Sequence, residues 1–142
     1  MNKVFRSTCI IASALDLIGD KWSLLIVRDM LLHRKKTFKQ LVSSDEGVAT
    51  NLLSSRLKLL ESIGVITKQK LKSNRKENIY LLTEKGIDLA PMIMELVIWS
   101  DKNVRVFNSK MNRNEFKSKD KSRVVTNFQK EYRKFAHQVI AS

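Results

Sequence analysis

Residues 48–66 read VATNLLSSRLKLLESIGVI, a stretch that separates into an apolar side and a polar side when it is wound as a helix. At about 100° per residue, Leu53, Leu57 and Leu60 share one side of a helix over residues 49–63. Short or flexible polar residues occupy the other side, namely Thr50, Asn51, Ser54, Ser55, Lys58 and Ser62. Gly64 follows the last periodic residue and predicts the end of the helix. The leucines therefore predict a helix that is held on a core with its polar side outward.

This polar side has the composition of a helix that enters the major groove of DNA. Small hydrogen-bonding side chains let the helix backbone approach base edges, and Asn can pair with adenine through two hydrogen bonds. A solvated surface helix is the alternative, and it would be preferred if the helix stood alone. Arg56 lies at the edge of the apolar side, where its guanidinium could reach a phosphate or a neighbouring carboxylate.

The segments that precede this helix predict a helix-turn-helix. Apolar residues at near-helical spacing predict a first helix that ends at Gly19, and Asp20 can cap a central core helix that runs to residue 32. Thr37 can cap a short helix over residues 38–44, and SDEGV at residues 44–48 has the composition of a turn. A short helix and a tight turn thus come directly before the polar-sided helix.

The segments that follow predict a β-hairpin and two further helices. Residues 65–83 contain two β-prone runs with a bend at Ser73 and Asn74. Thr83 restarts a helix that runs to residue 107, in which Pro91 should cause a kink or mark a junction. From Val124 onward, apolar residues recur at helical spacing, and we expect a second subunit to cover this stripe. The predicted fold is α+β and mostly helical: a winged helix-turn-helix with a two-stranded hairpin wing and added terminal helices for dimerisation.

Net charge indicates a polyanionic partner. The chain has 27 Lys and Arg against 14 Asp and Glu, which gives a net charge of +13 and a pI near 10.1. Such a charge attracts nucleic acid or anionic lipid. The predicted hairpin concentrates basic residues, and these could contact phosphate or protect an exposed strand edge: Lys68, Lys70, Lys72, Arg75 and Lys76. We find no apolar run of membrane-spanning length and no signal peptide, and so expect a cytoplasmic protein.

Residue types needed for catalysis or metal binding are scarce. Cys9 is the only cysteine, and His33 and His137 have no ligand-spaced neighbours. We therefore expect no disulfide, metal, cofactor or enzymatic activity. The large apolar residues Trp22, Trp99, Met92 and Met94 are expected to belong to the core rather than to a pocket for an effector.

The sequence resembles the HxlR-type winged helix-turn-helix transcription regulators, a family related in fold to the MarR regulators. The motifs that carry the resemblance are, in chain order, Cys9, ALDLIGDKWSLLIVRDML at residues 14–31, FKQL at 38–41, LSSRLKLLESIGVI at 53–66, YLLTEKG at 80–86 and LAPMIMELVIWS at 89–100. We assign residues 9–103 to the DNA-binding domain of that family. Residues 104–142 form a basic C-terminal extension with an expected dimerisation helix.

The resemblance implies a homodimer that is joined by its first and last helices and binds a near-palindromic operator in double-stranded DNA. The predicted DNA contacts are Lys36, Thr37, Thr50, Asn51, Ser54, Ser55, Arg56, Lys58, Lys72, Arg75 and Lys76. The alternative function is a winged-helix module that binds protein or RNA through its basic surface, chiefly residues 110–123.

Cys9 is the candidate for redox sensing, because some members of the family sense electrophiles or oxidants through an N-terminal cysteine. Lys3, Arg6 and the start of the following helix could stabilise a thiolate there. The alternative is a thiol that packs in the dimer interface. Two departures from the family pattern stand out: Ile10 follows Cys9 where proline is usual, and the hairpin reads KSNRK where proline is frequent.

Overall fold

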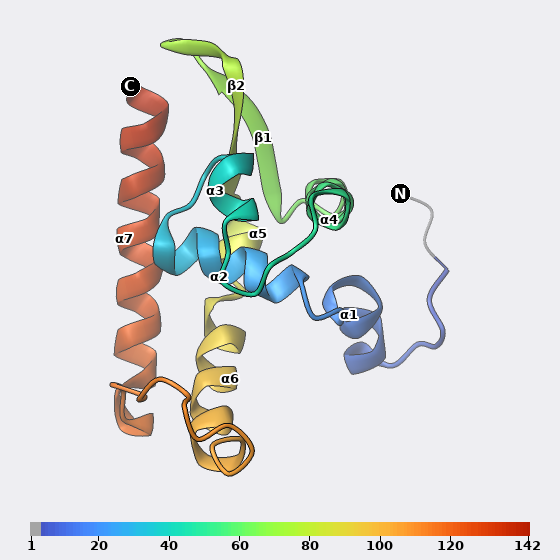
Figure 1. Cartoon of the computed structure of the whole chain (residues 1–142), viewed down its shortest axis with the longest axis vertical. Helices are drawn as coiled ribbons and strands as arrows, with labels where there is room; N and C mark the ends of the chain where they lie inside the picture. Colours follow the sequence, from blue (N-terminus) through green and yellow to red (C-terminus); the bar gives the residue numbers. More distant parts are fainter. Residues whose placement is uncertain (1–3) are drawn as a thin grey trace.

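The order of elements along residues 4–142, which the computed structural model describes, confirms the predicted winged helix-turn-helix (Figure 1). The elements are α1 (Ile10–Ile18), α2 (Ser23–His33), α3 (Phe38–Val42), α4 (Thr50–Ser62), β1 (Ile66–Leu71), β2 (Asn74–Leu82), α5 (Glu84–Ile87), α6 (Ala90–Asn103), a 3-10 turn (Ser118–Asp120) and α7 (Lys121–Ala141). Helices α3 and α4 form the helix-turn-helix, and the antiparallel pair β1 and β2 forms the wing. No helix of this part of the chain has the length and apolar composition to cross a membrane.

Helix α2 is the central core helix, as predicted. Val27 and Met30 are completely buried on it. Its start is capped by Asp20, whose Oδ2 accepts hydrogen bonds from the backbone N–H groups of Trp22 and Ser23, both at 3.0 Å. A capping carboxylate satisfies N–H groups that have no acceptor within the helix. The predicted role of Asp20 is confirmed.

Helix α4 ends where the sequence predicts. Gly64 has a φ of +78°, a left-handed conformation that glycine adopts without strain. The N–H of Val65 donates to the carbonyl of Leu60 at 2.9 Å, and the N–H of Gly64 donates to that of Glu61 at 3.0 Å. These two bonds are a Schellman motif, which satisfies the last carbonyls of the helix and turns the chain into β1.

The turn of the wing lies slightly earlier than predicted. It is formed by Lys72 and Ser73, whereas the sequence suggested a bend at Ser73 and Asn74. Strand β2 starts at Asn74 and has more residues than β1 near the tip, because the pairing is irregular between Gln69 and Leu71. Because β2 already begins at Asn74, the turn consists of the two residues directly after β1.

The predicted helix over residues 83–107 is divided in two. Thr83 caps α5 by accepting the N–H of Gly86 at 3.2 Å, and Pro91 occupies the first turn of α6. Proline is tolerated there because the first N–H groups of a helix have no acceptor within it. The junction that Pro91 predicted is confirmed, and a single continuous helix is not formed.

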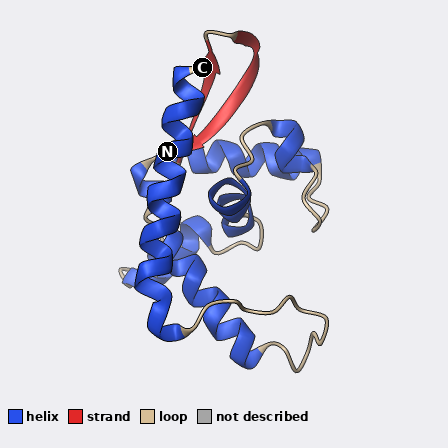
Figure 2. Ribbon diagram, turned by 90° about the vertical axis from the view of Figure 1, so that its left-hand side faces the viewer, coloured by secondary structure: helices blue, strands red, loops and turns tan. Residues whose placement is uncertain are grey.

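The apolar stripe on α7 is covered by the chain that carries it, and this corrects the expectation of a second subunit there. Helix α7 runs along the long axis of the molecule, beside α6 at one end and the wing at the other (Figures 1 and 2). Val124, Val125 and Tyr132 are buried in the same core as the helix-turn-helix. The boundary drawn after residue 103 from the sequence therefore does not separate two hydrophobic cores, because α7 shares its core with the helix-turn-helix.

Candidate nucleic-acid interface

The polar side of α4 faces outward, as predicted. Leu53 and Leu60 are completely buried and Leu57 is 3% exposed, so these three leucines fix the rotation of the helix about its axis. Thr50, Asn51, Ser55 and Lys58 are exposed, and Ser54 is half-buried. Within residues 4–142, the side chains of Asn51 and Lys58 have no hydrogen-bonding or ion-pair partner. Their polar groups are thus available to an external partner.

An ion-pair network fixes the turn that leads into α4. Arg28 on α2 donates two hydrogen bonds to Glu46 in that turn, from Nη2 to Oε1 at 2.8 Å and from Nη1 to Oε2 at 3.1 Å. The same guanidinium contacts Asp29, which is 2% exposed and also lies 3.4 Å from Lys35 Nζ. The buried carboxylate of Asp29 and its two cationic partners thus connect α2 to the α2–α3 connection through Lys35 and to the α3–α4 turn through Arg28.

The hydrogen bonds from Arg28, followed by that from Ser44, lower the pKa of Glu46 from 4.5 to about 2. Sequence reasoning missed this network. The available signal was Asp29 itself, because a carboxylate within an otherwise buried helix requires a cationic or hydrogen-bonding partner. The sequence alone indicates no role for Arg28, the partner of Asp29, or for Glu46, the second partner of Arg28.

Arg56 contacts a carboxylate of its own chain, the second of the two outcomes that its position allowed. Its Nη1 lies 3.6 Å from Oδ1 of Asp20, so α4 is tied to the start of α2. Its Nε is buried without a hydrogen-bonding partner among residues 4–142. Burial alone would raise the pKa of Asp20, but hydrogen bonds from Ser23 and Trp22 and the charge of Arg56 outweigh it, so the pKa is lowered. Arg56 thus helps to position α4, and its contact with DNA stays a prediction.

Thr37 is also a positioning residue in this structure. It is 9% exposed, and its hydroxyl oxygen accepts the backbone N–H of Gln40 at 3.1 Å while Oε1 of Gln40 accepts the N–H of Thr37 at 3.2 Å. This reciprocal capping box starts α3. Thr37 thus has a capping role within the protein, and its contact with DNA stays a prediction. Lys36 is half-buried, and its carbonyl accepts the N–H of Tyr80 on the wing at 2.7 Å.

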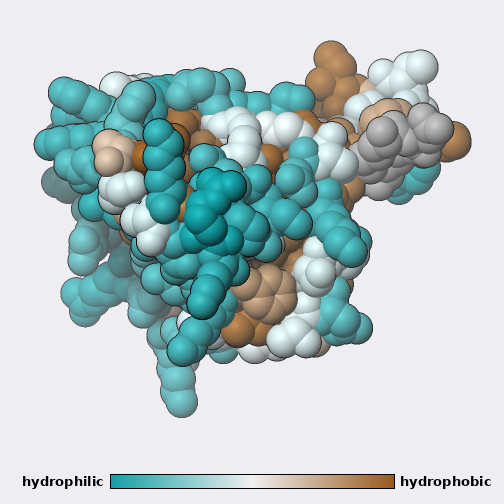
Figure 3. All heavy atoms as spheres, turned by 90° about the horizontal axis from the view of Figure 1, so that it is seen from above, coloured by the Kyte–Doolittle hydropathy of each residue, from teal (hydrophilic) through white to brown (hydrophobic). Residues whose placement is uncertain are grey.

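The wing carries an exposed cluster of basic residues at its tip. Lys72 lies in the turn, and Arg75 and Lys76 follow on β2, all three exposed. Helix α4 lies beside the base of the wing (Figure 1), and a view from above, onto the tip of the wing, is dominated by hydrophilic side chains (Figure 3). The predicted contacts therefore lie on two elements that pack against each other, α4 and the wing.

Cys9 is exposed and stands immediately before α1, at its N-cap position. The nearby Arg6 is paired with Asp16, with Nε 2.5 Å from Oδ1, so its charge is directed to that carboxylate. Lys3, the other basic residue considered for this thiol, lies outside the described residues. The exposed position agrees with either a reactive thiol or an interface thiol.

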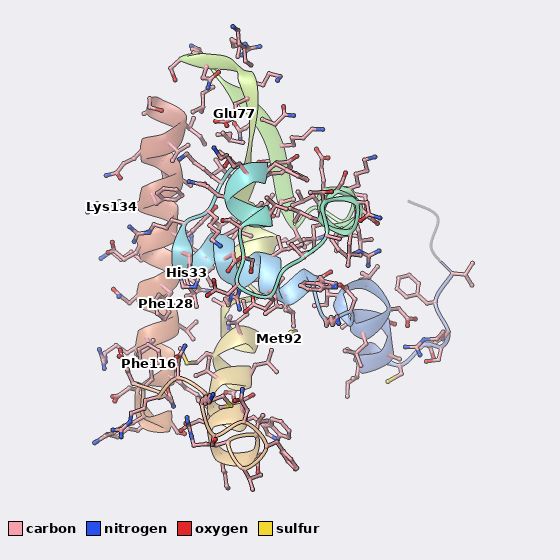
Figure 4. All side chains as sticks on the ribbon, viewed as in Figure 1. His33, Glu77, Met92, Phe116, Phe128 and Lys134 are labelled. Atoms are coloured by element: carbon pink, nitrogen blue, oxygen red, sulfur yellow. The ribbon has the colours of Figure 1, made fainter. Side chains whose placement is uncertain are left out.

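Two residues expected in the core lie on the surface. Met92 is 40% exposed and Trp99 is 60% exposed on α6, whereas Met94 is buried and Trp22 is half-buried. Met92 lies on the side of α6 that faces away from α7 (Figure 4). Helix α6 is apolar on its core-facing side and on its solvent-exposed side. Helical spacing alone therefore could not predict which of the two sides is buried.

A sequence profile of the HxlR-like helix-turn-helix family matches residues 17–108. An uncharacterised helix-turn-helix transcriptional regulator of Mycobacterium bovis is 35% identical over 91 residues, which are 64% of this chain and 56% of that protein, so the match spans little more than half of the relative. The transcriptional regulator YodB of Bacillus subtilis is 34% identical over 63% of this chain and 79% of its own length.

Solved structures agree with these matches. PA1607, described as a transcription factor, superposes with a TM-score of 0.67 at 31% identity, over 81% of this chain and 78% of its own. Reduced YodB superposes with a TM-score of 0.58 at 32% identity, over 68% of this chain and 95% of its own. YodB has also been solved in a quinone-bound form. The likeness therefore holds in sequence and in fold.

Proposed function

The chain belongs to the HxlR-like helix-turn-helix family, and from this premise we propose that it is a DNA-binding transcription regulator. Helix α4 enters the major groove, and the wing contacts the phosphate backbone or the minor groove. The observation that carries the proposal is the outward side of α4, where Asn51 and Lys58 are exposed and have no partner among the described residues, beside half-buried Ser54. Such a role places the protein in the cytoplasm with the chromosome.

The contacts divide by chemistry. Asn51 and Ser54, with Thr50 and Ser55, are placed to read base edges, whereas Lys58 and the wing cations bind phosphate and set the register on the duplex. Lys36 lies at the base of the wing and adds positive charge there. Arg56 and Thr37 act within the protein by fixing α4 and α3.

We test this by selecting bound duplexes from a randomised pool and measuring affinity for the selected and scrambled sequences across salt concentrations. Specific binding predicts that a preference for the selected duplex remains after general attraction has been screened. Loss of affinity for both duplexes together would favour the alternative of a non-specific basic module. Preferential binding of single-stranded RNA over either duplex would support the RNA-binding alternative.

A homodimer is the second part of the proposal. Helix α1 stands out from the body (Figure 1) with Ile10, Ile11 and Leu15 at 88%, 71% and 55% exposure. Helix α6 adds exposed Trp99 and Leu96. Apolar residues in such number on two helices favour a protein partner, and a second copy of the chain fits the two half-sites of a near-palindromic operator.

The oligomeric state of Trp99→Asp tests the dimer, with Ile140→Asp as control. Ile140 is 56% exposed on α7, so it has comparable exposure outside the proposed interface. In analytical ultracentrifugation, wild type and Ile140→Asp should sediment as dimers and Trp99→Asp as a monomer. A monomeric wild type would remove the dimer from the proposal.

Cys9 supports a further element of this proposal, the sensing of oxidants or electrophiles. The thiol is exposed in the single chain, and a relative has been crystallised with quinone bound. If Cys9 is the sensor, diamide or quinone should change DNA affinity of the wild type and leave Cys9→Ser unaffected. An equal response of both proteins would show that the thiol is not the sensor.

A further inference from the structure

Backbone N–H groups on the outer edge of β2 donate hydrogen bonds to acceptors outside the hairpin. The N–H of Tyr80 donates to the carbonyl of Lys36, and the N–H of Leu82 donates to the hydroxyl oxygen of Tyr132 on α7 at 2.9 Å. Tyr132 is 1% exposed, so the bond to Leu82 is buried. A buried N–H that loses its acceptor is costly, and this makes the phenol of Tyr132 the structural partner of the strand edge.

The wing is also packed on both of its faces. Tyr80 and Leu82 belong to the main core, whereas Ile79 and Leu81 alternate to the other face and are 2% and 3% exposed. That second face is covered by Val139 of α7, with Phe135 and Ala136 around it. A two-stranded hairpin alone is at best marginally stable in water, so this second layer determines how firmly the wing is held.

Other contacts fix α7 to the elements around the wing. Arg133 donates from Nε and Nη2 to the carboxylate of Glu84, at 3.0 and 2.9 Å, directly after β2. Gln129 donates to the carbonyl of Ile87 at 3.1 Å, and the guanidinium of Arg34 lies 5.7 Å from the ring centre of Phe135. Lys134 lies on the side of α7 away from the wing (Figure 4), so the apolar side of the helix is the one that meets β2.

We propose that α7 is a wing brace, formed by Tyr132, Phe135, Ala136 and Val139, which positions the basic tip of the wing for DNA. This part of the chain follows residue 108, where the family match ends. The wing brace orders the hairpin before DNA binds. The entropic cost of ordering the hairpin around Arg75 and Lys76 therefore does not reduce the affinity of these residues for phosphate. Tyr132 and Val139 are thus positioning residues that act through the wing, and this role rests on the proposed DNA-binding function.

The brace itself is tested without DNA, by amide hydrogen exchange of the full chain. We compare Tyr132→Phe and Val139→Ala with Val124→Ala, a control on the same helix with the same 9% exposure as Val139, but in the main core. Loss of the buried acceptor in Tyr132→Phe, or of the apolar cover in Val139→Ala, should accelerate exchange in β1 and β2, by about tenfold or more for Tyr132→Phe, with α2 and α4 unchanged. Unchanged exchange in the hairpin, or equal acceleration of hairpin and core, would overturn the brace.

The consequence for DNA is tested with a double-mutant cycle on the selected duplex. Tyr132→Phe is measured in the wild-type wing and in the Arg75→Gln/Lys76→Gln wing. If Tyr132 acts through the wing, it should weaken binding several-fold in the first background and have no further effect in the second. An equal loss in both would overturn the positioning role. If the wild type binds no duplex, the proposed function fails, and the exchange data still decide whether α7 braces the wing.

Discussion

Neutralising the tip of the wing should weaken binding to every duplex in a salt-dependent manner. Arg75 and Lys76 are exposed and lie next to the turn of the hairpin. If each contacts one phosphate, Arg75→Gln/Lys76→Gln should reduce the salt slope, log Kd against log salt, by about 1.8 per protomer and about 3.6 per dimer. If wild type and variant bind equally at about 1 M salt, the variant should bind roughly 60-fold more weakly than wild type, per protomer, at about 0.1 M salt.

The assay is fluorescence anisotropy of a labelled duplex over a series of salt concentrations. The control is Lys117→Gln/Lys119→Gln, which removes the same charge from exposed residues just before α7, far from the wing (Figure 1). The control should keep nearly the wild-type slope, because general attraction changes little with two distant charges. An unchanged slope in the wing variant, or an equal change in both variants, would remove the wing from the DNA contact.

Three further predictions concern stability, measured by denaturant or acid unfolding. Leu60→Ala removes a completely buried side chain under α4 and should lower the free energy of unfolding by about 2–5 kcal/mol. Thr37→Ala removes one half of the capping box with Gln40 and should cost about 1 kcal/mol. Because Arg28 and Ser44 lower the pKa of Glu46 from 4.5 to about 2, the stability from Glu46 is complete above about pH 5 and disappears as the pH falls toward 2. Glu46→Gln should therefore unfold with a weaker dependence on pH in that range.

The elements with local chemical signals were predictable from the sequence. Asp20, Thr37 and Gly64 begin or end helices through side-chain and backbone chemistry that depends on neighbouring residues only. The alternation of leucine and short polar residues in α4 likewise defined both its buried and its outward side. The candidate site on α4 and the wing could be proposed from the sequence for the same reason.

What could not be predicted depends on contacts between distant segments. Whether Arg56 meets Asp20 or a phosphate is decided by how α4 lies on α2, and the cover on α7 is decided by how the chain returns beside the wing. Residues 104–120, which end in the short 3-10 turn, separate α6 from α7, and they carry no periodic pattern that would fix the direction of return. Apolar spacing on α6 and α7 indicated helices but not which of their sides meets the core.

The central claim is that the outward side of α4 reads bases, and the base preference of Asn51→Ala tests it most directly. We compare duplexes selected from a randomised pool by wild type, Asn51→Ala and Lys72→Ala. Asn51→Ala should lose preference at specific, symmetry-related positions of the selected duplex, whereas Lys72→Ala should bind more weakly with the preference intact. Identical preferences of Asn51→Ala and wild type would contradict the account.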